Sequence, residues 1–369
     1  MQAEVLNRIR QFGECVDSDT RLDASLVTTL KQENLFSKLL PTSLNGSQMD
    51  YPPYIKLVQQ VAEADGSVGW CMNQGSVLAS LARLLPGETA KRIYSSPNIT
   101  LANGPPGHCE SVKQKNGYSL SGRWTFSSGI CHADWLIGMA PVRQNDEIVD
   151  YRWHFFRKEL AEVVEDWPVN GLKATGSYAF TVKDLHIPAS HAVKVEIRED
   201  DAPLYQIPLN LLFACGFAAV ALGVSRAALD FALETLQLKV KRFDKQTANQ
   251  YQLTQDQVGR AEAIWQAAEA FLHRTVETVW EKLISESTCS MDNRIKLRLA
   301  ATHTIREASR ATDLAYELCS TESIFAENSI QKRFQDMHVI TQHLQGRPEV
   351  YSVVGKHYLG LDPDHHLIS

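Results

Sequence analysis

The spacing of apolar residues divides the chain into three regions. Up to about residue 94, apolar positions recur three or four residues apart, as in helices that bury one face. From about 99 to 195 the apolar runs are short, rich in β-branched and aromatic residues, and separated by turn sequences such as Asn116-Gly117. After Pro208 the helical spacing returns. We therefore predict an α+β protein with an N-terminal helical domain, a central β-domain and a C-terminal helical domain, at 1–98, 99–200 and 201–369.

The C-terminal region has the most regular pattern. Weakly polar stretches separate four long helical segments, which are predicted at 209–244, 254–286, 291–321 and 324–344. Four such helices form an antiparallel four-helix bundle. Residues 211–224 are apolar on every side, which is typical of a helix buried at the centre of a bundle and is short for a membrane span.

The central region predicts a compact β-sandwich or β-barrel. Its β-type runs are short and lie at 118–121, 135–140, 151–156, 178–182 and 192–195. The sequence Asn103-Gly104-Pro105-Pro106-Gly107 is predicted to be a turn between strands.

Composition narrows the range of partners and compartments. The 369 residues carry a formal net charge of −6 without a long basic run, so neither nucleic acid nor an anionic membrane is favoured as a partner. Seven widely spread cysteines contain no Cys-x-x-Cys pair, which favours free thiols in a reducing cytoplasm over a disulfide framework or a zinc ribbon. The first ten residues predict an amphipathic helix and lack the apolar core of a signal peptide.

One segment carries most of the candidate chemistry. Residues 122–135 are Gly-Arg-Trp-Thr-Phe-Ser-Ser-Gly-Ile-Cys-His-Ala-Asp-Trp. Strand-like alternation places Trp124 and Phe126 before two adjacent hydroxyls, Ser127 and Ser128, and Gly129 allows the backbone to turn close to a ligand. An apolar plate beside a small hydroxyl suits a flat ligand with polar edges. A β-hairpin with a serine turn is the alternative.

Three sequence motifs resemble those of the acyl-CoA dehydrogenase superfamily, and the resemblance covers essentially the whole chain. Residues 118–135 resemble its central flavin-facing strand, Gly171-Leu-Lys-Ala-Thr-Gly-Ser-Tyr-Ala-Phe resembles its second β-domain motif, and Ala64-Asp-Gly-Ser-Val-Gly-Trp resembles the turn before the helix that lines the substrate cavity. The paired serines and the C-terminal stretch Phe334-Gln-Asp-Met-His-Val-Ile-Thr-Gln-His resemble the branch of two-component flavin-dependent monooxygenases.

This resemblance implies a function. Members of the branch use reduced flavin, as FADH2 or FMNH2, and O2 through a C4a-(hydro)peroxyflavin to oxygenate a small aromatic or related substrate. It also implies a homotetramer. A separate flavin reductase is implied as well, and this agrees with the sequence, which has no Gly-x-Gly-x-x-Gly strand–helix turn for a nicotinamide site of its own. An acyl-CoA-using flavoenzyme is the alternative, but Thr341-Gln342-His343-Leu344 lacks the carboxylate base of the dehydrogenases. A non-catalytic relative is the third possibility.

The resemblance also assigns roles to residues. Ser128 is the first catalytic candidate, with its hydroxyl near flavin N5, and His343 is the candidate acid–base residue because imidazole titrates near neutrality. Ser127 is expected to be structural. The remaining candidates are cofactor-binding Asn103, Gly104, Phe126 and Gly129, and substrate-binding Trp70, Asn73, Leu78 and Gln342. Phenol-hydroxylating relatives often carry a histidine where Leu78 falls, which puts a simple phenol substrate in doubt.

Several other polar residues have structural interpretations. Asp336 lies two helical turns before His343 and is expected in an ion pair rather than in a His–Asp dyad. His338 and His343 lie on different helix faces, so no metal site is predicted. Arg260 and Arg347 are interpreted as phosphate or intersubunit contacts or as solvated or paired surface arginines. The pair His365-His366 is expected to be a solvated terminus.

Overall fold

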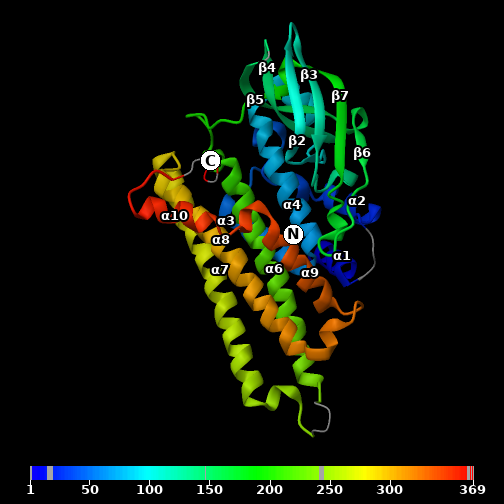
Figure 1. Ribbon diagram of the computed structural model, residues 1–369, viewed down its shortest axis with the longest axis vertical. Helices are drawn as coiled ribbons and strands as arrows, with labels where there is room; N and C mark the ends of the chain where they lie inside the picture. Colours follow the sequence, from blue (N-terminus) through cyan, green and yellow to red (C-terminus); the bar gives the residue numbers. More distant parts are fainter. Residues whose placement is uncertain are drawn as a thin grey trace.

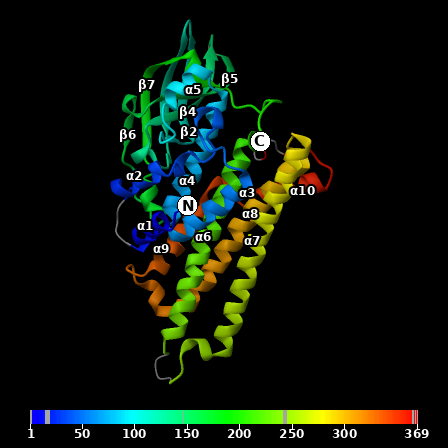
Figure 2. The same cartoon turned by 180° about the vertical axis from the view of Figure 1, so that it is seen from behind.

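The computed structural model describes residues 2–14, 20–145, 147–240, 245–363, 366 and 368. Cys15, His365 and the last four residues of the helix predicted at 209–244 lie outside the described residues. Figures 1 and 2 show the β-domain at one end of an elongated molecule, with the longest helices extending away from it.

The N-terminal region is helical, as predicted. Its helices are α1 (Ala3–Glu14), α2 (Ala24–Gln32), α3 (Tyr51–Ala64), α4 (Gly66–Ala79) and α5 (Gly87–Ile93). Asp65 caps α4, because its carboxylate accepts the backbone N–H of Val68 at 2.9 Å. Every residue of α4 except Gln74 is buried. This helix packs against both α3 and α6, which makes it the central element between the domains (Figure 1).

The β-domain is one sheet whose two halves fold over a shared core. Its strands are β1 (Leu101–Asn103), β2 (Pro106–Gln114), β3 (Gly117–Trp124), β4 (Trp135–Gln144), β5 (Glu147–Arg157), β6 (Glu162–Val164), β7 (Ala179–Pro188) and β8 (Ala192–Val193). The order is β6-β7-β3-β2-β4-β5-β8, with β1 beside β4. Only Ser111 and Val112 join β2 to β4, so the halves separate and enclose Trp124, Leu136 and Phe180.

Two details of the β-domain differ from the sequence prediction. Pro106 and Gly107 do not belong to a turn but begin β2, at a strand start where the missing N–H of proline is tolerated. Strand β3 ends at Trp124, so the predicted alternation does not reach Phe126, whose φ of 52° is left-handed. As a result Trp124 is buried in the β-domain core, whereas Phe126 is 62% exposed.

The described part of the C-terminal region contains the four predicted helices and one more. The bundle consists of α6 (Leu209–Leu238), α7 (Gln252–Glu286), α8 (Met291–Cys319) and α9 (Ser329–Gln342), and the short α10 (Val350–Tyr358) packs on α8. In α6, the most apolar 18-residue window is 94% buried inside the protein. Although α6 has the length and composition of a membrane span, it is the core helix of the bundle (Figure 2).

Helices α4 and α6 are held at close range by a glycine. Asn73 on α4 is fully buried, accepts a hydrogen bond from the Tyr54 hydroxyl at 3.0 Å and donates to the Phe213 carbonyl at 3.3 Å. A Cβ on Gly216 of α6 would lie 1.9 Å from the Asn73 side-chain oxygen. The amide of Asn73 is tied at both ends, so it cannot move to make room.

We expect Gly216→Ala to reduce the free energy of unfolding by about 1–3 kcal/mol, the usual effect of overpacking a core. Urea denaturation measures this change. Gly259→Ala is the matched control, because no atom lies within 4 Å of a Cβ at this exposed position in α7; alanine there should add about 0.5–1 kcal/mol through helix propensity. Equal stability of the two variants would contradict the close packing of α4 on α6.

Candidate active site

A cavity of about 590 Å³ lies where α4, α6, the end of α9 and the loops of the β-domain meet. Seven of the ten residues predicted for the site line it: Trp70, Asn103, Gly104, Phe126, Ser128, Gln342 and His343. They come from all three sequence regions, so the fold assembles the site from distant segments. The volume is in the range of small-molecule and cofactor pockets.

The other three predicted residues lie elsewhere. Asn73 binds Tyr54 and Phe213 inside the helical core, and the cavity is lined instead by its neighbour Gln74. Leu78 is fully buried in the same core. Gly129 has the left-handed conformation expected of a turn glycine, with φ of 81°, but a Cβ there would meet His132 rather than the cavity. The structure therefore gives these three residues packing and turn roles.

Ser128 is positioned by hydrogen bonds between two loops. Its backbone N–H donates to the carbonyl of Phe126, and the flanking N–H groups of Ser127 and Gly129 donate to the carbonyls of Tyr178 and Thr175. These bonds fasten the 126–129 segment to the 175–178 segment. The second segment belongs to the motif that begins at Gly171, where a Cβ would lie 2.2 Å from the Gln335 carbonyl. Glycine at 171 therefore allows the loop to approach α9.

The hydroxyl of Ser128 belongs to a chain of four polar side chains. The Trp70 indole N–H donates to Ser128 Oγ at 3.0 Å, Ser128 and Ser177 are 2.7 Å apart, and Ser177 and Thr175 are also 2.7 Å apart. Thr175 donates its proton to the Leu172 carbonyl at 2.7 Å, since a carbonyl can only accept.

The direction of every proton in this chain follows from its two ends. Because the Thr175 hydroxyl donates its hydrogen bond to a carbonyl, it must accept one from Ser177, and Ser177 must then accept one from Ser128. Ser128 accepts from Trp70 at the same time. Its remaining lone pair makes Ser128 a hydrogen-bond acceptor toward the cavity.

Ser127 has no such role. Its side chain is fully buried, and its Oγ has no hydrogen-bond partner within the described part of the chain. A Cβ on Gly104 would lie 2.7 Å from this oxygen, so Ser127 packs behind the cavity-lining loop.

Aromatic rings form much of the cavity wall. Phe126 meets Trp167 edge to face at a centroid distance of 5.7 Å, and Trp153 also lines the cavity. A left-handed φ at a bulky residue such as Phe126 is uncommon and tends to occur at functional sites. Trp70 and Phe217, which also line the cavity, are stacked with their ring centroids 3.8 Å apart. Flat apolar walls with a few hydroxyl and amide groups fit a ring system with polar edges.

His343 lies at the C-terminal end of α9 with non-helical backbone angles. Its ring packs edge-on against Trp70 and Phe217 at centroid distances of 5.0 and 4.9 Å. Burial, followed by the positive charges of Arg347 and Arg298, lowers the pKa of His343 to about 4, so the imidazole is neutral at pH 7. Nδ1 accepts the Gln345 backbone N–H at 3.4 Å, which leaves the proton on Nε2.

The neighbouring polar residues form no dyad or metal site with His343. Asp336 is buried and accepts the Leu172 backbone N–H, and burial raises its pKa to about 6. His338 Nε2 instead lies 2.9 Å from Asp313 on α8. Within the described residues no group of three or more histidine, cysteine, aspartate or glutamate side chains is arranged to hold a metal ion.

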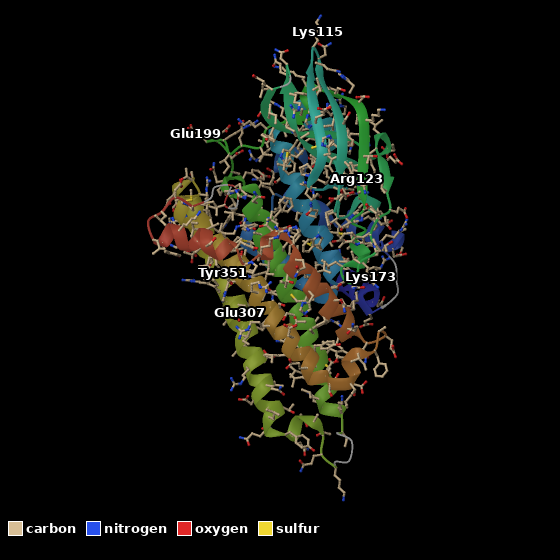
Figure 3. The ribbon with its side chains drawn as sticks, viewed as in Figure 1. Lys115, Arg123, Lys173, Glu199, Glu307 and Tyr351 are labelled. Atoms are coloured by element: carbon tan, nitrogen blue, oxygen red, sulfur yellow. The ribbon has the colours of Figure 1, made fainter. Side chains whose placement is uncertain are left out.

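The two candidate arginines have different surroundings. Arg260 forms an exposed pair with Asp256, one helical turn away on α7. Arg347 lines the cavity. Lys173, labelled in Figure 3, is exposed beside the buried Leu172 of the cavity wall.

Sequence reasoning missed part of the lining. Thr175 and Ser177 lie inside a motif that was identified, and their hydroxyls next to Gly176 were the available signal. Phe213 and Phe217 lie on the uniformly apolar α6, where no periodicity distinguishes one face from another. Gln345 follows the end of α9 in a short 3₁₀ turn.

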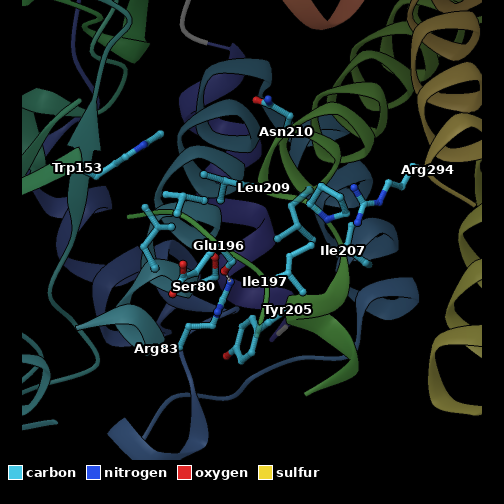
Figure 4. A pocket seen from close by; sticks show the side chains of 14 residues that line it. Ser80, Arg83, Trp153, Glu196, Ile197, Tyr205, Ile207, Leu209, Asn210 and Arg294 are labelled. Carbon is cyan, nitrogen blue, oxygen red and sulfur yellow. Dashed lines mark hydrogen bonds between the residues drawn. The ribbon is translucent and has the colours of Figure 1, made fainter. Parts of the chain in front are cut away.

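A second cavity of about 500 Å³ adjoins the first and shares Trp153 and Asn210 with it (Figure 4). Its Arg83 is already paired with Asp201 at 2.6 Å, and Arg294 donates to the Cys289 carbonyl. Because its charged groups are occupied in this way, the first cavity is the better candidate for the active site.

The chain is similar to known proteins along most of its length. The family model for the acyl-CoA dehydrogenase C-terminal domain matches residues 215–348. Indole-3-acetate monooxygenase of Pseudomonas putida is 29% identical over 359 residues, which are 96% of this chain and 91% of that protein. The crystal structure of 3-HSA hydroxylase from Rhodococcus sp. RHA1 has a TM-score of 0.90 at 21% identity, covering 98% of this chain and 96% of that one.

The family model and these relatives confirm the predicted resemblance to the acyl-CoA dehydrogenase superfamily. XiaF from Streptomyces sp., whose structure is in complex with FADH2 and glycerol, has the same fold with a TM-score of 0.90 at 21% identity, over 98% of this chain and 96% of that chain. The predicted fold and the predicted resemblance are thereby confirmed. Unlike a dehydrogenase of this superfamily, the protein has no aspartate or glutamate among the described residues that line its cavity.

Proposed function

We propose that the protein is the oxygenase component of a two-component flavin-dependent monooxygenase that oxygenates a small aromatic substrate. The observation that carries this proposal is Ser128, which presents an acceptor hydroxyl in an aromatic cavity without a carboxylate among its described residues. The Pseudomonas putida relative, which is named a monooxygenase of indole-3-acetate, supports the same reaction class and an aromatic substrate.

The residues of the cavity fit a flavin ring. Bound reduced flavin, as FADH2 or FMNH2, would supply the electrons that activate O2. Phe126, Trp153 and Trp167 would hold the flat ring, and Asn103 and Gly104 would contact its polar edge. Ser128 would accept a hydrogen bond from N5–H, a hydrogen that the reduced ring carries and the oxidised ring lacks. The same aromatic walls exclude water from the reacting atoms.

The proposal includes the surroundings of the enzyme. A separate flavin reductase would deliver the reduced flavin, because the chain has no Gly-x-Gly-x-x-Gly strand–helix turn for a nicotinamide. We place the protein in the cytoplasm, where such a reductase operates and thiols remain reduced. A homotetramer is proposed as well, since α7 carries exposed apolar side chains, including Leu253 and Phe271, that a partner would cover.

Rapid mixing tests the proposal directly. When the protein is loaded anaerobically with reduced FMN or FAD and mixed with O2, we expect an absorbance transient that belongs to neither reduced nor oxidised flavin. Small aromatic substrates should shorten its lifetime and yield an oxygenated product. Reoxidation in one monotonic step, at the rate of free flavin and unaffected by any aromatic compound, would contradict the proposal.

A further inference from the structure

The stretch that follows α9 presents hydrogen-bond donors to the cavity. His343 carries its proton on Nε2, and Gln345 and Arg347 line the cavity two and four residues further along. Arg347 is exposed at this wall and forms no ion pair in the described part of the chain. Because the cavity wall also lacks described carboxylates, its net electrostatic character is positive.

A buried arginine stands behind this wall. Arg298 on α8 is 1% exposed, and its guanidinium donates to the side-chain oxygen of Gln345. Its Nε has no hydrogen-bond partner among the described residues, and no aspartate or glutamate of the described chain forms an ion pair with the guanidinium. A buried cation without a counter-charge is costly, so an anion nearby would lower the energy of the site.

Arg298 also determines the orientation of the Gln345 amide. Since Oε1 of Gln345 accepts from the guanidinium, Nε2 is the end left to donate, and within the described chain no protein acceptor engages it. Arg298 therefore acts as a positioning residue, while Gln345 Nε2 and the Arg347 guanidinium are the groups that can reach a ligand.

We propose that Gln345 and Arg347, oriented by Arg298 and assisted by His343 Nε2–H, form a subsite for the carboxylate of the aromatic substrate. The inference rests on the proposed function and narrows its substrate class to small aromatic acids. An arginine fork and an amide N–H2 match the acceptor oxygens of a carboxylate. The adjacent rings of Trp70, Phe213 and Phe217 would hold the aromatic part.

The position of the subsite favours the substrate over the flavin as the source of the anion. The ring centroids of Trp70 and His343 are 5.0 Å apart, and the Trp70 indole N–H donates to Ser128 Oγ at 3.0 Å. His343 therefore lies about one indole ring away from the Ser128 hydroxyl assigned to N5, and Gln345 and Arg347 follow it in the chain. A flavin phosphate is separated from the ring system by the ribityl chain, so it belongs further from Ser128.

Equilibrium binding of acid and amide pairs tests the subsite. Indole-3-acetate, phenylacetate and benzoate are titrated by calorimetry into the full-length protein, flavin-free and with reduced flavin under anaerobic conditions, beside the three corresponding amides. We expect at least one acid to bind about tenfold or more tightly than its amide. In Arg347→Gln this preference should disappear, and Arg260→Gln, which alters an exposed arginine on α7, should retain it.

A second variant separates binding from folding. Gln345→Glu places a negative charge beside Arg298, so acid binding should fall by about tenfold or more while the melting temperature does not decrease. Equal affinity for acid and amide, failure of all three acids to bind, or a loss of reduced-flavin affinity in Arg347→Gln with the acid preference intact would each overturn the proposal. Failure of the proposed function is distinct, because it would remove flavin binding or product formation while leaving acid binding by the flavin-free protein.

Discussion

Replacing Ser128 with alanine is expected to reduce the oxygenated product formed per O2 consumed by about tenfold to a hundredfold, with hydrogen peroxide released instead. The reason is the arrangement of the hydroxyl chain. Ser128 accepts from Trp70 and donates to Ser177, so the lone pair that faces the cavity is fixed in direction before any ligand binds. Alanine removes this acceptor without removing the aromatic walls, so flavin should still bind while water and protons gain access to its reacting face.

Thr175, at the other end of this series of hydrogen-bonded hydroxyls, provides a variant with a smaller expected effect. Thr175→Val removes the hydroxyl that accepts from Ser177 and thereby frees Ser177 to donate to Ser128. Ser128 would then be able to donate toward the cavity, which suits oxidised flavin as well as reduced flavin. We expect the ratio of reduced-flavin to oxidised-flavin affinity to decrease by several-fold in this variant, as measured by anaerobic and aerobic titrations.

Ser127→Ala is the matched control for Ser128→Ala. Both changes remove one oxygen from adjacent serines, but the buried Ser127 Oγ has no partner in the described residues, so its removal should leave coupling and stability unchanged or slightly improved. Product and peroxide are quantified in the same reactions, and melting temperatures verify folding. If Ser127→Ala and Ser128→Ala formed equal amounts of oxygenated product per O2 consumed, the role assigned to Ser128 would be wrong.

The arrangement of elements was predictable because it depends on periodicity. The apolar surface of 211–224 required a central helix, and α6 is that helix. Strand runs and turn sequences likewise placed β3, β4, β5, β7 and β8. The strands β1 and β6 were not predicted, because their three residues each are too few to show a period.

The site was predictable where a motif gave both residue type and backbone. The structure brings Ser128 and His343, from distant motifs, to one cavity. Asn73 and Leu78 do not line the cavity, and Gln74 of the same helix does. Because α4 is buried on almost every side, periodicity cannot indicate which of its faces meets the cavity. Phe126 reaches the wall through a left-handed turn rather than through strand alternation, a change that no pattern in the sequence revealed.

His343 provides the second large expected effect. His343→Phe keeps an aromatic ring between Trp70 and Phe217 but loses the Nε2 donor, and we expect the rate of oxygenation to decrease by about a hundredfold. His343→Gln retains an N–H2 donor near the same position and should remain within about tenfold of the parent protein. An imidazole that must gain and lose a proton would make Gln as damaging as Phe, so the pair distinguishes donation from acid–base catalysis.

The pH dependence of the rate supplies an independent test of the same role. Burial and the charges of Arg347 and Arg298 lower the pKa of His343 to about 4, so the imidazole stays neutral from neutrality down to about pH 5. The parent rate should therefore show no His343 ionisation near pH 6.5, the usual histidine range, and should change only as the pH approaches 4. Arg347→Gln removes a positive charge that lowers this pKa, so the pKa must rise and the change must move to higher pH. NMR titration of the His343 ring, with His343→Phe to assign the signal, would contradict the donor role if the parent imidazole protonated near pH 6.5.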